Sequence, residues 1–320
     1  MDKRKVWDRR EAMALSAAAA AAGMGLVPAA PAGAAPRTLT PRLLPAQRSW
    51  TPVPQQAPAR DGMAPLPGVQ LYYWDTGGDG EAVLLMHPIT GSALVWGYQQ
   101  PVFAKAGYRV IAFSRRGFAR SESGAPGETS YAVDDIEALL DYLKVGKLHM
   151  VGSAAGAFVV PDYAQSHPDR LLSMVVSCSQ GGVTEKSYRD KIAAINPPAL
   201  GNLPVSFREL GPSYRAANPE GRAEWERLEE HSRSGPGSVR QAARNRIDFA
   251  DLEKIRTPTL VMPGDADLYG PPALALEFAS HVQGSEVAIL SESGHSGYWE
   301  QPDAFNATVL EFIGRHRAGR

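Results

Sequence analysis

The sequence predicts an α/β fold in which a mostly parallel central sheet is flanked by helices, and three observations support this. Short apolar runs rich in Val, Ile and Leu recur along the chain, as is typical of strands buried on both faces of a parallel sheet. Amphipathic stretches of helical length separate these runs. The chain has 320 residues, of which 44% are hydrophobic, so it is long enough to bury one large core. An open sheet covered by helices accounts for all three observations.

The first element is an N-terminal segment that we do not expect to belong to the fold. Residues 1–34 begin with basic residues, continue in an alanine-rich run, and end in Ala32-Gly33-Ala34, an A-x-A cleavage pattern. Arg9 and Arg10 directly precede the apolar run, so the segment resembles a twin-arginine signal peptide. We expect an exported protein, periplasmic or secreted, that keeps no stable membrane span after cleavage.

The next segment, residues 35–67, holds many prolines and few apolar pairs. A stretch of this composition cannot bury much surface, so we predict a linker that leads to a folded domain over residues 68–320.

Within the domain, six apolar runs predict buried strands and two amphipathic stretches predict helices. The strands are predicted at residues 82–88, 108–114, 147–153, 170–179, 258–264 and 286–290. The apolar face of residues 131–146 comprises Val133, Ile136, Leu139, Leu140 and Leu143, and that of residues 302–316 comprises Phe305, Val309, Phe312 and Ile313.

One stretch, from about residue 181 to residue 251, contains no strand-like run. Its segments 218–235 and 237–255 are polar, helical in pattern, and broken by Gly and Pro. Ligands of α/β sheets lie beyond the carboxyl ends of the strands, so a helical insertion at that edge would form a cap over the site. Arg208 and Arg215 of this segment are candidates for contact with a substrate carboxylate, although solvated surface is the simpler interpretation.

Composition excludes several classes of function. The formal net charge is −1 and no basic stripe is present, so we expect no nucleic-acid partner. The single cysteine, Cys178, cannot form an intrachain disulfide. No metal-ligand cluster and no dinucleotide-binding glycine pattern appears, so we expect no metal and no cofactor. A small, moderately apolar organic substrate is the expected partner.

Five motifs in series resemble those of the α/β-hydrolase family. They are HPITGS (87–92), FSRRGFARS (113–121), HMVGSAAGAF (149–158), PTLVMPGDADLYGPP (258–272) and GHSGYWEQP (294–302). Their order and spacing match the family over residues 68–317. The resemblance implies the α/β-hydrolase fold and a hydrolase, with lyase or cofactor-free oxygenase chemistry as variants within the family.

The resemblance also assigns roles to individual positions. His295 falls on the base position and Asp267 on the acid position, where Asp265 is the competing candidate. The backbone N–H groups of Ile89 and Ala155 fall on the two donor positions of the oxyanion hole. Pro88 replaces a customary glycine, which does not remove a donor.

The chain departs from the family at the nucleophile elbow. Gly152 and Gly156 frame the elbow, yet its apex is Ala154, which cannot form an acyl-enzyme. Four explanations stay open: an engineered serine-to-alanine variant, a hydroxyl moved to Ser153, a nucleophilic Cys178, or a site without a protein nucleophile. Ser153 precedes the apex, so its side chain should point away from His295.

Of the mechanistic explanations, we favour the last. A His–Asp pair beside an oxyanion hole can act as a general base that activates water or removes a proton from the substrate. This predicts cleavage of an ester, C–C or C–O bond without a serine nucleophile. The alternative is a noncatalytic protein that keeps the fold to bind a ligand, although both His295 and Asp267 are retained.

Overall fold

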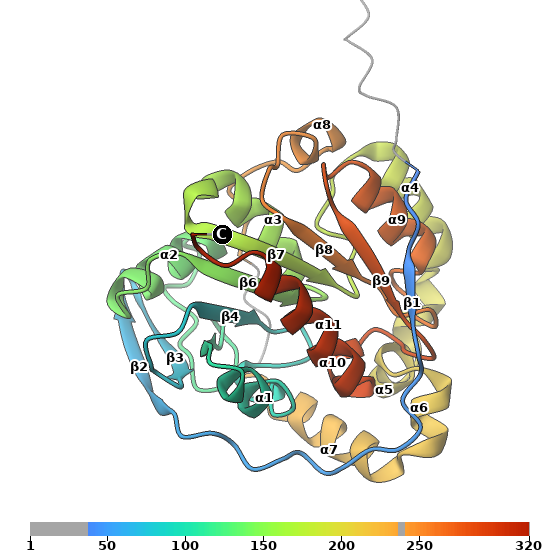
Figure 1. Ribbon diagram of the computed structural model, residues 1–320, viewed down its shortest axis with the longest axis horizontal. Coiled ribbons are helices and arrows are strands. Elements are labelled where there is room, and N and C mark those ends of the chain that lie inside the picture. The colour runs from blue at the N-terminus through green and yellow to red at the C-terminus, as the bar shows by residue number, and fades with distance from the viewer. Residues whose placement is uncertain (1–37, 236–240, 320) are drawn as a thin grey trace, which may run out of the picture. The chain divides into compact units, whose positions relative to one another are not determined.

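The computed structural model describes residues 38–235 and 241–319. The predicted signal peptide, residues 1–34, lies outside the described residues. Within the described ranges, no helix is both long enough and apolar enough to cross a membrane. The unit formed by residues 36–320 is built on a nine-stranded sheet with helices on both faces (Figure 1).

The sheet is mostly parallel, as predicted. Its order is β1-β9-β8-β7-β6-β4-β5-β3-β2, and only the pairs β2·β3 and β3·β5 are antiparallel. The strands are β1 (Arg42–Leu44), β2 (Arg60–Leu66), β3 (Val69–Asp75), β4 (Ala82–Met86), β5 (Arg109–Phe113), β6 (Leu148–Ser153), β7 (Leu171–Ser177), β8 (Thr259–Met262) and β9 (Glu286–Leu290). All six strands predicted from apolar runs are therefore present. Every residue of β4 and β6 is buried, because helices cover both faces of these central strands.

The segment predicted as a linker, residues 35–67, is not a linker throughout, since it supplies two edge strands of the sheet. β1 pairs in parallel with β9, and β2 pairs antiparallel with β3. An edge strand needs hydrogen bonds on one side only, so β2 accommodates Pro65 and buries only Ala64 and Leu66. Between the strands, the indole of Trp50 donates to the carbonyl of Glu300 at 2.6 Å.

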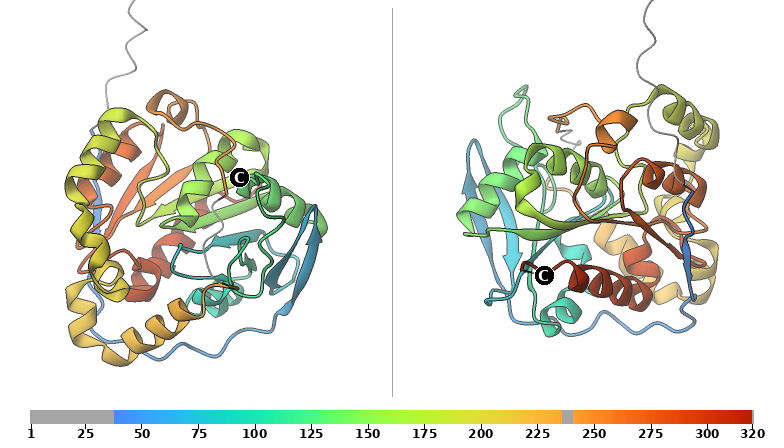
Figure 2. Two further views of the ribbon diagram at one scale, coloured as in Figure 1. Left: turned by 180° about the vertical axis from the view of Figure 1, so that it is seen from behind. Right: turned by 45° about the horizontal axis from the view of Figure 1, so that its top comes forward.

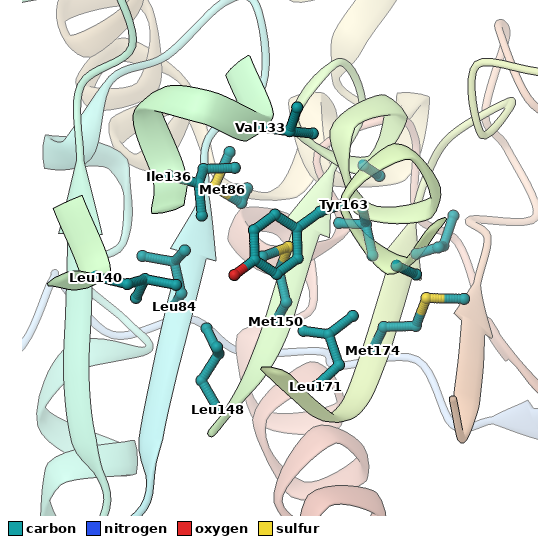
Figure 3. Packing of buried hydrophobic residues seen from close by; sticks show 14 of the residues in the cluster. Leu84, Met86, Val133, Ile136, Leu140, Leu148, Met150, Tyr163, Leu171 and Met174 are labelled. Atoms are coloured by element: carbon teal, nitrogen blue, oxygen red, sulfur yellow. The ribbon is translucent and has the colours of Figure 1, made fainter. Parts of the chain in front are cut away.

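The helices divide between the two faces of the sheet. One hydrophobic cluster contains buried side chains of α2 (Ala132–Tyr142), α3 (Gly156–Ser166) and α9 (Pro272–Ser280). The other contains those of α1 (Gln100–Lys105), α10 (Gly297–Glu300) and α11 (Pro302–Arg315). In the first cluster, Ile136 and Leu140 of α2 and Tyr163 of α3 lie over the central strands, among Leu84, Met150 and Leu148 (Figure 3). The predicted apolar faces of α2 and α11 are buried throughout.

The segment between β7 and β8 has no strand among its described residues and carries helices instead. They are α4 (Lys186–Ile195), α5 (Val205–Glu209), α6 (Pro212–Ala217), α7 (Pro219–Glu230) and α8 (Phe249–Leu252). The helices α4 to α7, coloured yellow-green to gold, follow one another along one side of the unit (Figure 2). We refer to residues 181–251 as the cap.

The second predicted cap helix, over residues 237–255, is mostly wrong. Only α8 is helical there among the described residues. The backbone N–H groups of Arg244 and Asn245 donate to the carboxylate of Asp162, both at 2.9 Å, and the N–H of Ala242 donates to the carbonyl of Ser130. These long-range bonds replace the helical bonds that the local sequence pattern favours.

Candidate active site

The turn between β6 and α3 has the geometry of a nucleophile elbow, with Ala154 at its apex. Ala154 has a φ of 51°, in the left-handed region that a non-glycine residue rarely adopts. Its N–H donates to the carbonyl of Ser177 at 3.0 Å, and its carbonyl accepts from the hydroxyl of Ser179 at 2.8 Å. The end of β7 therefore holds this strained backbone on both sides.

Both frame glycines are required by close packing. A Cβ atom on Gly152 would lie 2.7 Å from the Cα of Ala157, at the start of α3. A Cβ atom on Gly156 would overlap the backbone carbonyls of Met86 and His87. The sequence pattern therefore reports a real steric requirement: α3 starts directly against the end of β4.

This packing brings the two predicted oxyanion donors to neighbouring backbone segments. Ala155 lies at the N-cap of α3, where free N–H groups and the helix dipole favour negative charge. Ile89 closely follows Met86 and His87, whose carbonyls Gly156 abuts, and its side chain is exposed. Neither N–H has an acceptor among the described residues. Both donors are thus available to a ligand oxygen.

His295 and Asp267 are brought together, as predicted. Nδ1 of His295 lies 2.8 Å from Oδ2 of Asp267, and both side chains are buried. The other carboxylate oxygen of Asp267 accepts from the N–H groups of Tyr269 and Gly270, at 2.8 and 3.1 Å. Asp265 is exposed and does not take the acid position.

Nε2 of His295 has no hydrogen-bond partner among the described residues, which leaves it available for proton transfer. Burial opposes a charge on the ring, but the negative charges of Asp267 and Glu209 outweigh it and raise the pKa of His295 to about 9. The imidazolium form is therefore the main form at neutral pH, and the basic form grows as the pH rises toward 9.

The elbow and the histidine loop meet at the end of β7. Cys178 follows this strand, and its sulfur lies 3.6 Å from the carbonyl of Gly294, next to His295. The following residue, Ser179, binds the carbonyl of Ala154. The segment that follows β7 thus contacts both the elbow and the loop of His295.

The two alternative nucleophiles are poorly placed. Cys178 is 1% exposed, and burial, together with the charge of Asp267, raises the pKa of its thiol far above the ordinary range. A thiol that cannot ionise is a poor nucleophile. Ser153 is fully buried, and its hydroxyl has no hydrogen-bond partner among the described residues, so His295 does not contact it.

Two buried carboxyl groups border the histidine, and the sequence reasoning assigned no role to either. The carboxylate of Glu300 accepts from the N–H groups of Gly211, Gly294 and Ser296, at 2.6, 3.0 and 3.2 Å. It therefore holds the residues on either side of His295 and joins them to the cap. Burial raises the pKa of Glu300 to about 7. The sequence feature that points to a role for Glu300 is its position in the GHSGYWEQP motif.

Glu209, at the end of α5, is the second of these groups. Its carbonyl accepts from the N–H groups of His295 and Ser296, at 2.7 and 3.2 Å. Its side chain is buried, one carboxyl oxygen has no partner among the described residues, and burial raises its pKa. No sequence pattern marks this residue, because its role arises from the fold of the cap.

The two cap arginines proposed from the sequence as substrate contacts, Arg208 and Arg215, bind neighbouring protein groups instead. The guanidinium of Arg208 donates to the hydroxyl of Tyr269 and the carbonyl of Leu203. That of Arg215 donates to the carbonyl of Leu210 and lies over the ring of Phe207. Within residues 38–235 and 241–319, no group of three His, Cys, Asp or Glu side chains could hold a metal ion.

Comparison with known proteins identifies the family of the chain. A family model for the alpha/beta hydrolase fold matches residues 81–302. The 2-hydroxy-6-oxononadienedioate/2-hydroxy-6-oxononatrienedioate hydrolase of Burkholderia vietnamiensis is 27% identical over 268 residues, which cover 77% of this chain and 92% of the relative. The 2-hydroxy-6-oxo-6-phenylhexa-2,4-dienoate hydrolase of Comamonas testosteroni is 25% identical over 270 residues, covering 76% and 91%.

Among solved structures, an esterase from Thermogutta terrifontis superimposes with a TM-score of 0.67 at 24% identity. The match covers 81% of this chain and 100% of the esterase. At this level of identity, the likeness shows a shared fold alone.

Proposed function

Because the chain belongs to the α/β-hydrolase family, we propose that it is a hydrolytic enzyme whose His295–Asp267 pair acts as a general base without a serine nucleophile. The substrate is a small, moderately apolar organic molecule with a cleavable ester, C–C or C–O bond. The named activities of relatives support a hydrolase: two of them are hydrolases of 2-hydroxy-6-oxo acids.

The proposed reaction follows from the groups that converge at the elbow. Nε2 of His295 takes a proton from a water molecule, and the hydroxide formed adds to the electrophilic carbon of the substrate. The N–H groups of Ile89 and Ala155 stabilise the resulting oxyanion. The proton on His295 then passes to the leaving group as the bond breaks, which returns the ring to its basic form. Asp267 keeps the proton of the resting ring on Nδ1 and stabilises the imidazolium.

One observation carries this proposal: His295 is paired with Asp267 in a chain whose elbow has no nucleophile at its apex. His295 has its carboxylate partner and an available Nε2, while Ala154 keeps the strained φ of 51° that an elbow requires. Strain of this kind costs about 1–3 kcal/mol and clusters at functional sites. A methyl group at the apex is smaller than a serine side chain, and we propose that the attacking water takes the place of the hydroxyl.

The test is a panel of small esters and vinylogous keto acids given to wild type, His295→Ala and a control, His231→Ala. His231 is an exposed cap histidine whose ring, among the described residues, is hydrogen-bonded to the carbonyl of Arg227 alone. The proposal requires turnover by wild type and by His231→Ala, with a loss of about 100-fold or more in His295→Ala. Equal behaviour of all three proteins would favour a binding protein.

We also propose that the protein is exported. Arg9 and Arg10 precede an alanine-rich run that ends in Ala32-Gly33-Ala34, so the mature chain should begin near Ala35. N-terminal sequencing of protein from its native host tests this. A chain that still begins at Met1 would contradict it.

A further inference from the structure

Two arginines contact the loop that follows β4. Arg115 follows β5, and its guanidinium donates to the carbonyl of His87 at 3.1 Å. Arg233, in the cap, donates to the carbonyl of Ile89 at 2.8 Å. Both guanidinium carbons lie near the ring of Phe118, at 4.8 Å for Arg115 and 4.0 Å for Arg233. The pair therefore borders the same loop that supplies one oxyanion donor.

The backbone fixes both arginines in place. The cap residues around Arg233 form an antiparallel bridge with the loop after β5: the N–H of Ala119 donates to the carbonyl of Ser232, and the N–H of Ser234 to the carbonyl of Gly117. The N–H of Arg115 donates to Nε2 of His87 at 3.0 Å. Burial and the charge of Arg115 hold the pKa of His87 well below its usual range, so this ring is neutral.

Neither guanidinium forms an ion pair with a carboxylate in the part of the chain that the structure describes. Glu229, which is half-buried, is the carboxyl group whose charge acts on Arg233, and the two form no ion pair in the described part of the chain. Nη1 of Arg233 is buried without a hydrogen-bond partner among the described residues. Burial, with the charge of Arg233, lowers the pKa of Arg115 to about 10.

Two like charges kept together and partly dehydrated are unfavourable unless an anion neutralises them. The planar guanidinium fork matches a carboxylate, which can accept two parallel hydrogen bonds. We propose that Arg115 and Arg233 form a recognition site for a carboxylate on the substrate. Ile89 then contributes to both parts of the site, since its N–H faces the oxyanion and its carbonyl holds Arg233.

This inference rests on the proposed function and narrows it: the substrate is an organic acid whose carboxylate lies close to the bond that is cleaved. The proposed base, His295, lies within the influence of the negative charges of Asp267 and Glu209. The field across the site would therefore orient an anionic substrate, with its carboxylate toward the cap arginine and its reacting carbon toward the base.

The test is a binding titration by calorimetry in a His295→Ala background, so that no substrate turns over. The probes are linear carboxylates from acetate to hexanoate, each compared with its neutral primary amide. The variants are Arg233→Gln, Arg233→Lys and the control Arg222→Gln. Arg222 is an exposed cap arginine paired with Glu226. Thermal melting of each variant checks that it is folded.

We expect at least one carboxylate to bind and its amide to bind at least about tenfold more weakly. Arg233→Gln should lose that preference, Arg233→Lys should keep part of it, and Arg222→Gln should keep all of it. Equal affinity for acids and amides, absence of binding across the series, or full affinity in Arg233→Gln would each overturn the inference. The titration does not depend on catalysis. If the carboxylates bind but the wild-type protein turns over no substrate, the proposed hydrolytic function is contradicted and the carboxylate site is not.

Discussion

The backbone N–H of His295 donates to the carbonyl of Glu209 at 2.7 Å, so the cap itself holds the loop of the proposed base. Glu300 forms a second connection between the cap and this loop, since its carboxylate accepts from the N–H groups of Gly211 in the cap and Gly294 in the loop. The cap is therefore part of the framework of the site, and a change at the junction should alter proton transfer as well as stability.

Replacement of Glu300 tests that junction. Glu300→Ala leaves three buried N–H groups without an acceptor, and we expect a loss of about 3 kcal/mol or more in the free energy of unfolding. Turnover should fall together with stability, because His295 loses its fixed position. Glu311→Ala is the control: this exposed residue pairs with Arg42, and its removal should cost less than about 0.5 kcal/mol. Urea unfolding measures the free energy of unfolding of both variants. Equal losses in Glu300→Ala and Glu311→Ala would contradict the role assigned to Glu300.

The same residue predicts a dependence of stability on pH. The pKa of Glu300 is about 7 in the folded protein, above its ordinary value of 4.5, so the folded state binds the proton more tightly. Its contribution to stability is complete below pH 4.5 and is lost as the pH rises through 7. Glu300→Gln cannot titrate, so the difference in stability between wild type and this variant should change across that window. A constant difference from pH 4 to 8 would refute this.

The elbow frame makes a steric prediction. Gly156→Ala would force a Cβ atom into the carbonyls of Met86 and His87, which should cost several kcal/mol or prevent folding. Gly146→Ala is the matched control, since a Cβ atom there meets no atom within 4 Å and its φ is not in the left-handed region. Thermal melting should separate the two clearly, and similar melting temperatures would mean that α3 does not pack against β4 as described.

Restoring a hydroxyl at the apex tests the geometry of the elbow. Because Ala154 keeps the left-handed φ of a nucleophile position, Ala154→Ser should react with a fluorophosphonate probe. The parent protein should stay unlabelled. Mass spectrometry locates the adduct, and labelling of the parent at Ser153 would restore that residue as a nucleophile.

The thiol of Cys178 should be inert in the folded protein. It is buried, and its raised pKa keeps it protonated at neutral pH. Titration with a thiol reagent should show no reaction until denaturant is added, and Cys178→Ala should retain turnover. Rapid reaction in the native state, together with loss of turnover in Cys178→Ala, would assign the chemistry to this residue.

The features that could be predicted from the sequence are those that depend on short-range residue patterns. Continuous apolar runs located the six central strands, and the spacing of Gly152 and Gly156 located an elbow whose steric basis the structure supplies. The sequence patterns did not predict β1, β2 and β3. The edge strands β1 and β2 need few apolar residues, and β1 pairs with β9, which is distant in the sequence. Glu209 and Arg233 were missed for a related reason: their roles depend on how the cap folds against the sheet.

The most direct test of the account is a pH–rate profile of kcat/KM for wild type, Asp267→Asn and His295→Ala with a substrate that turns over. A general base must be unprotonated, so the wild-type rate should rise with pH and level off above about 9, the pKa of His295. Asp267→Asn removes the carboxylate that favours the charged ring, so its inflection should move to lower pH and its plateau should fall. His295→Ala should lose about 100-fold or more and show no inflection. Near wild-type turnover in His295→Ala, with the same inflection, would contradict the assignment of His295 as the base.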